Sequence, residues 1–592
     1  MLWLAGMLSA QAAAPTLRYT LAMPAPQTHY YEVSMKLGGF ASDFTDVKMP
    51  VWAPGSYLVR EFARHVEGFT ATSAAGQALA VEKINKNTWR IKHPKTLDFT
   101  IKYSVYAYEL SVRTSYLDAD HGYLNGSSIF LYPADNKALS SILTVQPAAG
   151  WSQVSTALRP AAGAGKFTFQ AASYDELADS PIEIGNQKIL NFTVNGTPHI
   201  VAMFGTYQVD ENRLVADMQR VCEEAQRVVG QNPLDRPYVF IVHNVERGGG
   251  GLEHLYSTTL GKSRSGWLSE AGYKSFLGLQ AHEYFHLWNV KRIRPIALGP
   301  FNYDQENYTH MLWVSEGFTE YMSNLITERA GFFTRDEYLS NLSSVITNLE
   351  AQPGNRVQPA SEASFDAWIK EYRPNENSYN TTVSYYGKGE AIGTVLDLMI
   401  INATQGAKHL DDVFRLLYAK YYKGLRRGFT DQEFQNAVAE VAGQRFDNFF
   451  KTRVYDAQPL DYATALGYAG LTLTSESAGT QGQLGAGLST SGRLLVTSTV
   501  RGGAAYLGGL NVNDEILALD DTKVASADEL NRVLSGKPVG TAIKLQVRHD
   551  GLPRDLNLTL TAAPLRYAIA PLPGTPTAAQ QTVLNKWLAA NK

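Results

Sequence analysis

The residues of this chain best suited to chemistry are two histidines and a glutamate in the pentapeptide His-Glu-Tyr-Phe-His at 282–286. On an α-helix, residues four apart lie on one face, so His282 and His286 can direct both imidazoles at a single metal ion. Glu283 stands beside the first histidine, where its carboxylate can take a proton from water. The pentapeptide therefore indicates a metal-dependent hydrolytic site, and its pattern is the zinc hydrolase signature.

A catalytic zinc ion takes three protein ligands and keeps a fourth position for water, so a third ligand must come from elsewhere in the chain. Glu316 and Glu320 lie four residues apart in the helical pattern of 309–330, so their carboxylates point the same way. Two acids on one face of a largely buried helix are costly unless charge or metal compensates them. We expect Glu316 to complete a site for one Zn²⁺ per chain and Glu320 to hydrogen-bond a ligating histidine.

Glu306 is the alternative third ligand. It follows His286 by 20 residues, a separation seen in thermolysin-like enzymes, whereas Glu316 follows it by 30. Glu306 lies in the polar stretch 302–307, before the expected start of the helix. Since 291–307 has the character of an inserted loop, which lengthens the separation, the sequence favours Glu316.

Composition describes a folded protein of several domains. The chain has 592 residues, 44% of them apolar and 18% charged, and this length predicts three or four domains. With 53 basic and 56 acidic residues, nothing in the charge favours nucleic acid or an anionic membrane as a partner. Cys222 is the only cysteine, which excludes intrachain disulfides and a cysteine-based metal site.

The first 14 residues have the apolar character of a secretory signal, with Ala12-Ala13-Ala14 as the expected cleavage site, although a basic n-region is missing. The stretch is too short to span a bilayer, and no other apolar run reaches about 18 residues. We expect an exported protein, periplasmic or secreted from a bacterium, without a transmembrane segment.

The pattern along the chain predicts an α+β multidomain protein. Short alternating runs such as 16–21 and 98–106, separated by turn residues, predict an N-terminal β-sandwich-like domain over 15–200. A mainly helical catalytic domain with a small sheet at its front is expected over 201–465. Its expected elements are helices at 212–229, 272–290, 309–330, 385–401 and 431–441 and a buried strand at 238–242. In the first of these domains, the turn 52–57 (Trp-Ala-Pro-Gly-Ser-Tyr) is interpreted as a packing feature.

A third unit at 466–565 resembles a PDZ domain, and a tail helix is expected within 566–592. The resemblance lies in 502–520, where Leu510, Ile516 and Leu519 are expected in the core. Ser526 is expected to cap a helix at 527–534, followed by strands at 542–547 and 556–560. The segment 484–488 (Leu-Gly-Ala-Gly-Leu) is a candidate site for peptide C-termini.

Residues further along the chain make the resemblance of the metal motif more specific. Together with Trp313 and the run Ser-Glu-Gly-Phe-Thr-Glu-Tyr at 315–321, it resembles the gluzincin aminopeptidases. The longer run 282–295 resembles the PDZ-containing glycyl aminopeptidase family. That family has a β-domain, a thermolysin-like catalytic domain and a PDZ domain, in the order expected here. The resemblance implies a zinc-dependent aminopeptidase that removes an N-terminal Gly or Ala from peptides with a free N-terminus.

Residues 250–254 (Gly-Gly-Leu-Glu-His) resemble the Gly-x-Met-Glu-Asn strand of these enzymes, whose glutamate holds the substrate α-ammonium. The resemblance implies that role for Glu253, whereas His254 and Leu252 depart from the pattern. Gly250 and Gly251 permit close approach of a peptide backbone to this strand, as a sheet edge that receives a peptide requires.

The segment 386–389 (Tyr-Gly-Lys-Gly) resembles the one whose tyrosine stabilises the oxyanion, which implies that role for Tyr386, with Tyr385 as the alternative. Three basic residues follow the motif: Lys291, Arg292 and Arg294. Their role is open, since they can either bind a substrate carboxylate or pair with Asp304 or Glu306.

Two other functions of the protein stay open as well. One is a zinc endopeptidase to which the PDZ domain delivers substrates, and the other is a non-catalytic PDZ scaffold.

Overall fold

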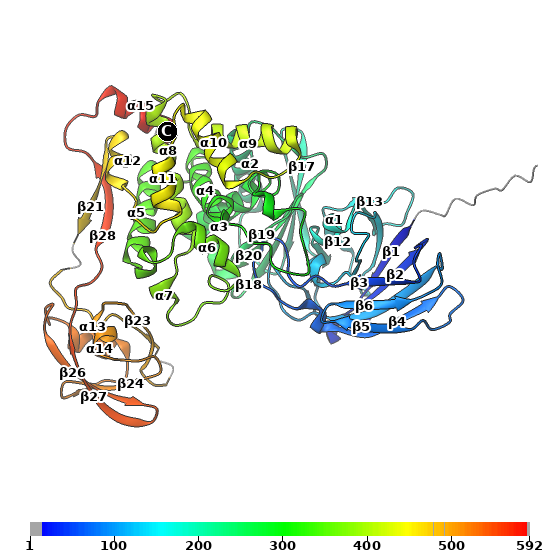
Figure 1. The fold of residues 1–592 in the computed structure, drawn as a ribbon, viewed down its shortest axis with the longest axis horizontal. Coiled ribbons are helices and arrows are strands. Elements are labelled where there is room, and N and C mark those ends of the chain that lie inside the picture. Colours follow the sequence, from blue (N-terminus) through cyan, green and yellow to red (C-terminus); the bar gives the residue numbers. More distant parts are fainter. Residues whose placement is uncertain (1–14, 477–478, 490–491, 589–592) are drawn as a thin grey trace, which may run out of the picture. The chain divides into compact units, whose positions relative to one another are not determined.

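The computed structural model describes residues 15–476, 479–489 and 492–588 (Figure 1). The expected signal-like segment at 1–14 lies outside the described residues. The chain forms two compact units. The first runs to Lys291 and includes Gly299–Asn307, and the second comprises Arg292–Leu298 and the residues from Tyr308 onward. Within the described ranges, no helix combines the length and apolarity needed to cross a membrane.

The N-terminal part of the first unit consists of β-sheets, as predicted. A seven-stranded sheet has the order β13 (Arg159–Pro160), β14 (Thr168–Ala171), β11 (Ser141–Gln146), β1 (Thr16–Ala22), β2 (Tyr30–Gly38), β7 (Phe99–Tyr106) and β4 (Val66–Ser73). A second sheet has the order β10 (Tyr132–Pro133), β3 (Phe44–Lys48), β6 (Thr88–Lys92) and β5 (Val81–Asn85). A third has the order β12 (Gln153–Thr156), β15 (Ile182–Gly185), β9 (Gly122–Leu124) and β8 (Tyr116–Leu117). Buried residues alternate along β2 and β7, so one face of the large sheet forms a core.

A mixed five-stranded sheet forms the other part of the first unit. Its order is β16 (Lys188–Val194), β17 (Thr197–Phe204), β18 (Tyr238–Val245), β20 (Ser257–Ser263) and β19 (Gly251–Glu253). β18 lies between two parallel neighbours and is almost wholly buried, as its continuous apolar run predicts. β19 pairs only with β20 and is therefore the edge strand.

Helices α2 (Glu211–Val229) and α3 (Glu270–Phe285) pack on each other, and α3 also contacts β19 and β20. Asp210 caps α2 by accepting backbone N–H bonds from Asn212 and Arg213. The prediction that the second helix continues to residue 290 is wrong. The backbone amides of Leu287 and Trp288 bond to carbonyls three residues back, and the amide of Lys291 bonds to the carbonyl of His286 five residues back. The regular α-helical pattern is therefore interrupted after the motif.

The second unit begins with helices, as predicted. They include α4 (Phe318–Arg329), α5 (Arg335–Ala351), α8 (Tyr385–Ala403), α9 (Leu410–Leu417), α10 (Asp431–Ala442), α11 (Asp447–Phe449) and α12 (Tyr462–Tyr468). The single helix expected at 309–330 is wrong in its first part, where a π-helical turn, η6 (Trp313–Gly317), precedes α4. Gly317 and Gly389 allow the backbones of η6 and α8 to touch, because a Cβ on either glycine would overlap the other segment.

The PDZ region has the strand order β22 (Ala486–Ser489), β23 (Leu495–Thr499), β24 (Glu515–Leu519), β26 (Ala542–His549) and β27 (Leu552–Thr559). Leu510, Ile516 and Leu519 lie in its core, as predicted. Ser526 caps α14 (Ala527–Leu534) by accepting the N–H of Glu529, also as predicted.

The PDZ region is joined to the helices by two paired strands, β21 (Leu471–Glu476) and β28 (Arg566–Pro571). The expected tail helix is α15 (Ala578–Trp587), whose last residue packs against the helices of the same unit. The indole Nε1 of Trp587 donates a hydrogen bond of 2.9 Å to the hydroxyl of Tyr321, which in turn donates one of 2.6 Å to Asp397. This chain of buried hydrogen bonds ties the C-terminal helix to α4 and α8.

One carboxylate holds two segments of the first unit. Asp179 follows α1 (Tyr174–Ala178) and accepts the backbone N–H of Leu255 at 2.9 Å. It also contacts Nδ1 of His254 at 3.0 Å and the ammonium of Lys291 at 2.9 Å. The residues directly after β19 and after α3 are thereby fixed to the same group.

Lys291 therefore pairs with Asp179, which was not among the partners considered from the sequence. Asp304 instead binds Lys48, because the loop 299–307 folds back onto the N-terminal sheets. Burial alone raises the pKa of Asp179, but the charge of Lys291 and the hydrogen bond from His254 outweigh burial and lower this pKa to about 2.

Trp587→Ala should lower the free energy of unfolding by about 3–5 kcal/mol, because it removes a fully buried indole and leaves a cavity between helices. Urea unfolding followed by circular dichroism measures this loss. Trp587→Phe removes mainly the indole donor and should cost about 1 kcal/mol. A Trp587→Ala protein as stable as the wild type would show that α15 does not contribute to the fold.

Asp179→Asn should destabilise the protein by about 2 kcal/mol at pH 7, given the shift of its pKa from 3.8 to about 2. The folded-state pKa is depressed, so the carboxylate's contribution is present above pH 4 and is lost as the pH falls through 2. Urea unfolding of both proteins at pH 7 and at pH 2 tests this sign. The two stabilities should differ at pH 7 and converge at pH 2, whereas a constant difference would contradict the linkage.

Candidate metal centre and peptide-binding edge

The two histidines of the motif lie one above the other at the end of α3. The backbone N–H of His286 still bonds to the carbonyl of His282, so the helical register extends to the second histidine. The centroids of their rings lie 4.7 Å apart, and both side chains are buried. Tyr284 contacts the side chains of His199 and Gln226 through its hydroxyl.

The tautomer of His286 is fixed by the turn that ends the helix. Nδ1 of this ring lies 2.6 Å from the carbonyl oxygen of Asn289, which can only accept a hydrogen bond. Nδ1 therefore carries a proton, and in the neutral ring Nε2 then keeps the lone pair, the arrangement typical of a metal-ligating histidine. Because α3 ends here, the carbonyl of Asn289 can orient the His286 ring so that Nε2 is available as a ligand atom.

Glu283 lies against the edge strand of the five-stranded sheet. A Cβ at Gly251 of β19 would overlap the Glu283 carboxylate, so only glycine allows the strand to lie this close. Gly250 has φ of +73°, a left-handed conformation that also favours glycine. The glycines that the sequence assigned to substrate binding therefore have a structural role as well.

Glu253 is a buried carboxylate with no hydrogen bond or ion pair through its side chain to any residue that the structure describes. Its exposed fraction is 4%. A Cβ on Gly55 would lie 2.6 and 2.7 Å from its two oxygens, and Gly55 has φ of +83°. The turn 52–57 therefore packs directly on this carboxylate, so its predicted packing role has a consequence for the site. The Pro-Gly pair in this turn was the signal available in the sequence.

Three groups of buried side chains that could hold a metal ion occur among the described residues, each with potential ligand atoms within 4.8 Å of one another. One consists of His282, His286 and Glu316, and a second consists of Glu253, Glu283 and His286. The third, His121, Glu183 and His243, was not found from the sequence because its members are far apart in the chain. In the second group two carboxylates lie close together, which is unfavourable for two negative charges unless a cation joins them.

Glu316 belongs to η6 of the second unit and is buried. Since η6 touches α8 through Gly317 and Gly389, Glu316 is held rigidly relative to the first turn of α8. In that turn Tyr385 is fully buried, whereas Tyr386 is partly exposed, and their rings stack at 4.8 Å. The exposure of Tyr386 favours it over Tyr385 as a residue that meets a substrate. Glu320 is partly buried on α4, and its bond to a histidine stays a prediction.

Lys388 is a buried lysine in the same segment, 2% exposed, and its ammonium donates to the carbonyls of Asn355 and Gln358 at 3.2 Å. Burial, together with the nearby charge of Arg356, lowers the pKa of Lys388 to about 8. Its hydrogen bonds tie α8 to the segment 353–358. The lysine of the Tyr-Gly-Lys-Gly motif therefore has a structural function that the sequence did not reveal.

Glu306, the alternative third ligand, lies partly exposed in the loop 299–307. Among the described residues it belongs to none of the three metal-binding groups. The sequence indicated that 302–307 is a polar loop. Such a loop keeps Glu306 near the surface, which explains why this residue belongs to none of the groups.

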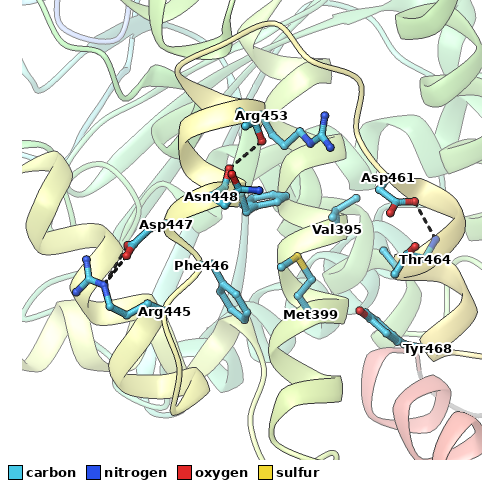
Figure 2. Close-up of a pocket in the computed structure, with 13 residues that line it drawn as sticks. Val395, Met399, Arg445, Phe446, Asp447, Asn448, Arg453, Asp461, Thr464 and Tyr468 are labelled. Atoms are coloured by element: carbon cyan, nitrogen blue, oxygen red, sulfur yellow. Dashed lines mark hydrogen bonds and ion pairs between the residues drawn. The ribbon is translucent and has the colours of Figure 1, made fainter.

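A separate cavity of about 310 Å³ lies between α8, α11 and α12 (Figure 2). Met399, Phe446 and Tyr468 supply much of its apolar lining, while Arg445 at its rim is paired with Asp447. None of the predicted site residues lines it. Its first contact on α8, Val395, is nine residues beyond Tyr386, or about 13 Å along the helix. The cavity is therefore distinct from the predicted site.

Three segments of the chain match known family models. Residues 18–186 match the Peptidase M61 N-terminal domain, 275–392 match M61 glycyl aminopeptidase and 470–560 match a PDZ domain. No curated protein was found with significant sequence similarity to the chain.

Solved structures similar to this chain were also found. An aminopeptidase N family protein from Idiomarina loihiensis is 29% identical, with a TM-score of 0.89 over 97% of this chain and 100% of that one. An M1 zinc metallopeptidase from Deinococcus radiodurans is 15% identical, with a TM-score of 0.46 over 75% of this chain and 94% of that one. Its two M61 segments and its PDZ segment stand in the order that the sequence resemblance implied, and the chain is a zinc metallo-aminopeptidase similar to the M61 glycyl aminopeptidases.

Proposed function

We propose that this zinc aminopeptidase removes an N-terminal glycine or alanine from peptides whose α-amino group is free. The observation that carries the proposal is Glu253. A buried carboxylate without a partner among the described residues is costly, and a substrate ammonium would supply the missing positive charge. One of its carboxylate oxygens lies within 4.8 Å of ligand atoms of Glu283 and His286, so an amine bound there would be next to the reacting groups.

We assign His282, His286 and Glu316 as the ligands of one zinc ion. Their side chains are buried, their ligand atoms lie within 4.8 Å of one another, and two imidazoles with one carboxylate match the donor set of catalytic zinc. The fixed tautomer of His286 supports the same assignment. When bound, zinc supplies Lewis-acid chemistry, since it lowers the pKa of water toward 7 and polarises the substrate carbonyl.

The remaining steps fall to residues of the chain. Glu283 accepts the proton of the attacking water and returns it to the leaving amine, which is general base followed by general acid catalysis. Tyr386 donates a hydrogen bond to the oxygen that becomes negatively charged. The edge strand β19, with Gly250 and Gly251, lies alongside the peptide, as sheet edges do in peptide recognition.

The preference for small residues rests on the family and on one structural feature. The turn 52–57 packs against Glu253, with Gly55 near van der Waals contact, so little space is left beside the anchored amine. A glycine or alanine side chain fits such a restricted position, whereas a leucine side chain would have to displace the turn.

Two proposals concern the rest of the chain. The edge strand β22 and the preceding Gly485, which has φ of +69°, are suited to receive a peptide C-terminus by strand addition. Export to the periplasm remains our proposal, supported by the signal-like residues 1–14.

Glycyl, alanyl and leucyl anilides test the proposed activity. We expect the first two to be hydrolysed, the activity to disappear with a chelator, and zinc to restore it. Glu283→Gln should retain zinc but lose turnover by about 10²- to 10⁴-fold, because general base catalysis is lost. Glu306→Gln is the matched control and should keep full activity. Substantial turnover by Glu283→Gln would contradict its assignment as the base.

Glu253→Gln distinguishes an aminopeptidase from an endopeptidase. The variant keeps the shape of the side chain but cannot pair with an ammonium, so kcat/KM for free-amine substrates should fall by about 10- to 100-fold. N-acetylated peptides should be poor substrates of both proteins. Internal cleavage of blocked peptides at an undiminished rate would favour the endopeptidase.

A further inference from the structure

The buried group His121, Glu183 and His243 connects the two parts of the first unit. His121 lies in the turn between β8 and β9, and Glu183 lies in β15 of the same N-terminal sheet. His243 lies in β18, the central strand of the five-stranded sheet. The three side chains therefore converge from segments that are 60 or more residues apart.

Their geometry is that of ligands facing a common point. Nδ1 of His121 lies 2.8 Å from Oε1 of Glu183, and Nε2 of His243 lies 2.9 Å from Oε2. All the ligand atoms lie within 4.8 Å of one another. Exposed fractions of 1%, 0% and 2% place the group in the interior. Two imidazoles and one carboxylate form the donor set preferred by zinc and related divalent ions.

The charge of the buried Glu183 carboxylate favours binding of a cation by this group. Among the residues that the structure describes, neither lysine nor arginine forms an ion pair with Glu183, whose only ionic partners are the two imidazoles. Among these residues, the buried carboxylate therefore has no lysine or arginine to compensate its charge. A divalent ion bound between the three side chains would supply that compensation.

Aromatic side chains hold the two rings in place. Phe204 stacks on His121 with centroids 3.4 Å apart and an interplanar angle of 12°. Tyr123 meets His243 edge-on at 4.7 Å, and its hydroxyl bonds to Thr259. Such an aromatic shell fixes the ring orientations, as the surroundings of metal sites commonly do.

We propose that His121, Glu183 and His243 bind a second divalent metal ion, zinc by their chemistry, which fastens the N-terminal β-sheets to the sheet that carries β19. The ligand atoms would be Nδ1 of His121, Nε2 of His243 and the Glu183 carboxylate. Binding moves the proton of each neutral ring to its other nitrogen, so no net proton is released. Three protein ligands leave one position of a four-coordinate ion for water.

Metal analysis of five full-length proteins after zinc loading and dialysis tests the proposal. The wild type should contain two zinc ions per chain, and His282→Ala with His286→Ala should contain one. Glu183→Gln should also contain one, and the combined variant none. His93→Gln, which alters a buried histidine outside the three groups, is the control and should contain two. Equal zinc content in the wild type and in Glu183→Gln would overturn the proposal.

The same series tests the second metal site and the catalytic zinc site separately. If the protein with His282→Ala and His286→Ala retains all its metal, the assignment of the catalytic zinc ligands is wrong, whatever the result for Glu183→Gln. If Glu183→Gln does not fold, a cobalt(II) titration of a protein in which Glu183 is intact tests the second site instead. Cobalt(II) added to the His282→Ala, His286→Ala protein should give visible absorption that saturates at one equivalent and raise its melting temperature. No cobalt absorption and no change in melting temperature would overturn the second site.

Discussion

The exclusion of water from carboxylates and imidazoles is the constraint on which this structure depends. An ionised group removed from water must be compensated by a hydrogen bond, an opposite charge or a metal ion. Asp179 meets that requirement with Lys291 and His254, which together lower its pKa. Glu253 does not meet it with any described residue, and this difference separates a structural acid from one suited to a ligand.

Close backbone approach is the second requirement, and glycines provide it. Gly251 admits the Glu283 carboxylate against β19, and Gly55 admits Glu253 against the turn 52–57. In the second unit Gly317 and Gly389 bring η6 and α8 into contact. The glycines in the motifs around Glu316 and Tyr386 thus determine how closely the elements that carry these residues can pack.

Much of this architecture could be predicted from the sequence. Periodicity identified the helices and strands, and a capping serine located the helix of the PDZ region to the residue. The end of α3 and the π-turn at η6 could not be predicted, because both arise from tertiary packing and not from local propensity. The partner of Lys291 was also missed, since Asp179 lies 112 residues away in the chain. For the same reason no local pattern could reveal the group formed by His121, Glu183 and His243.

The pairing of β21 with β28 gives the PDZ region an attachment at both of its ends. The chain leaves the helices through β21, forms the PDZ fold, returns through β28 and finishes in α15, which is anchored by Trp587. The region is therefore an inserted module on a two-stranded stalk. A single proteolytic cut within it would leave both fragments connected to the enzyme, and the stalk restricts twisting far more than a one-stranded tether would.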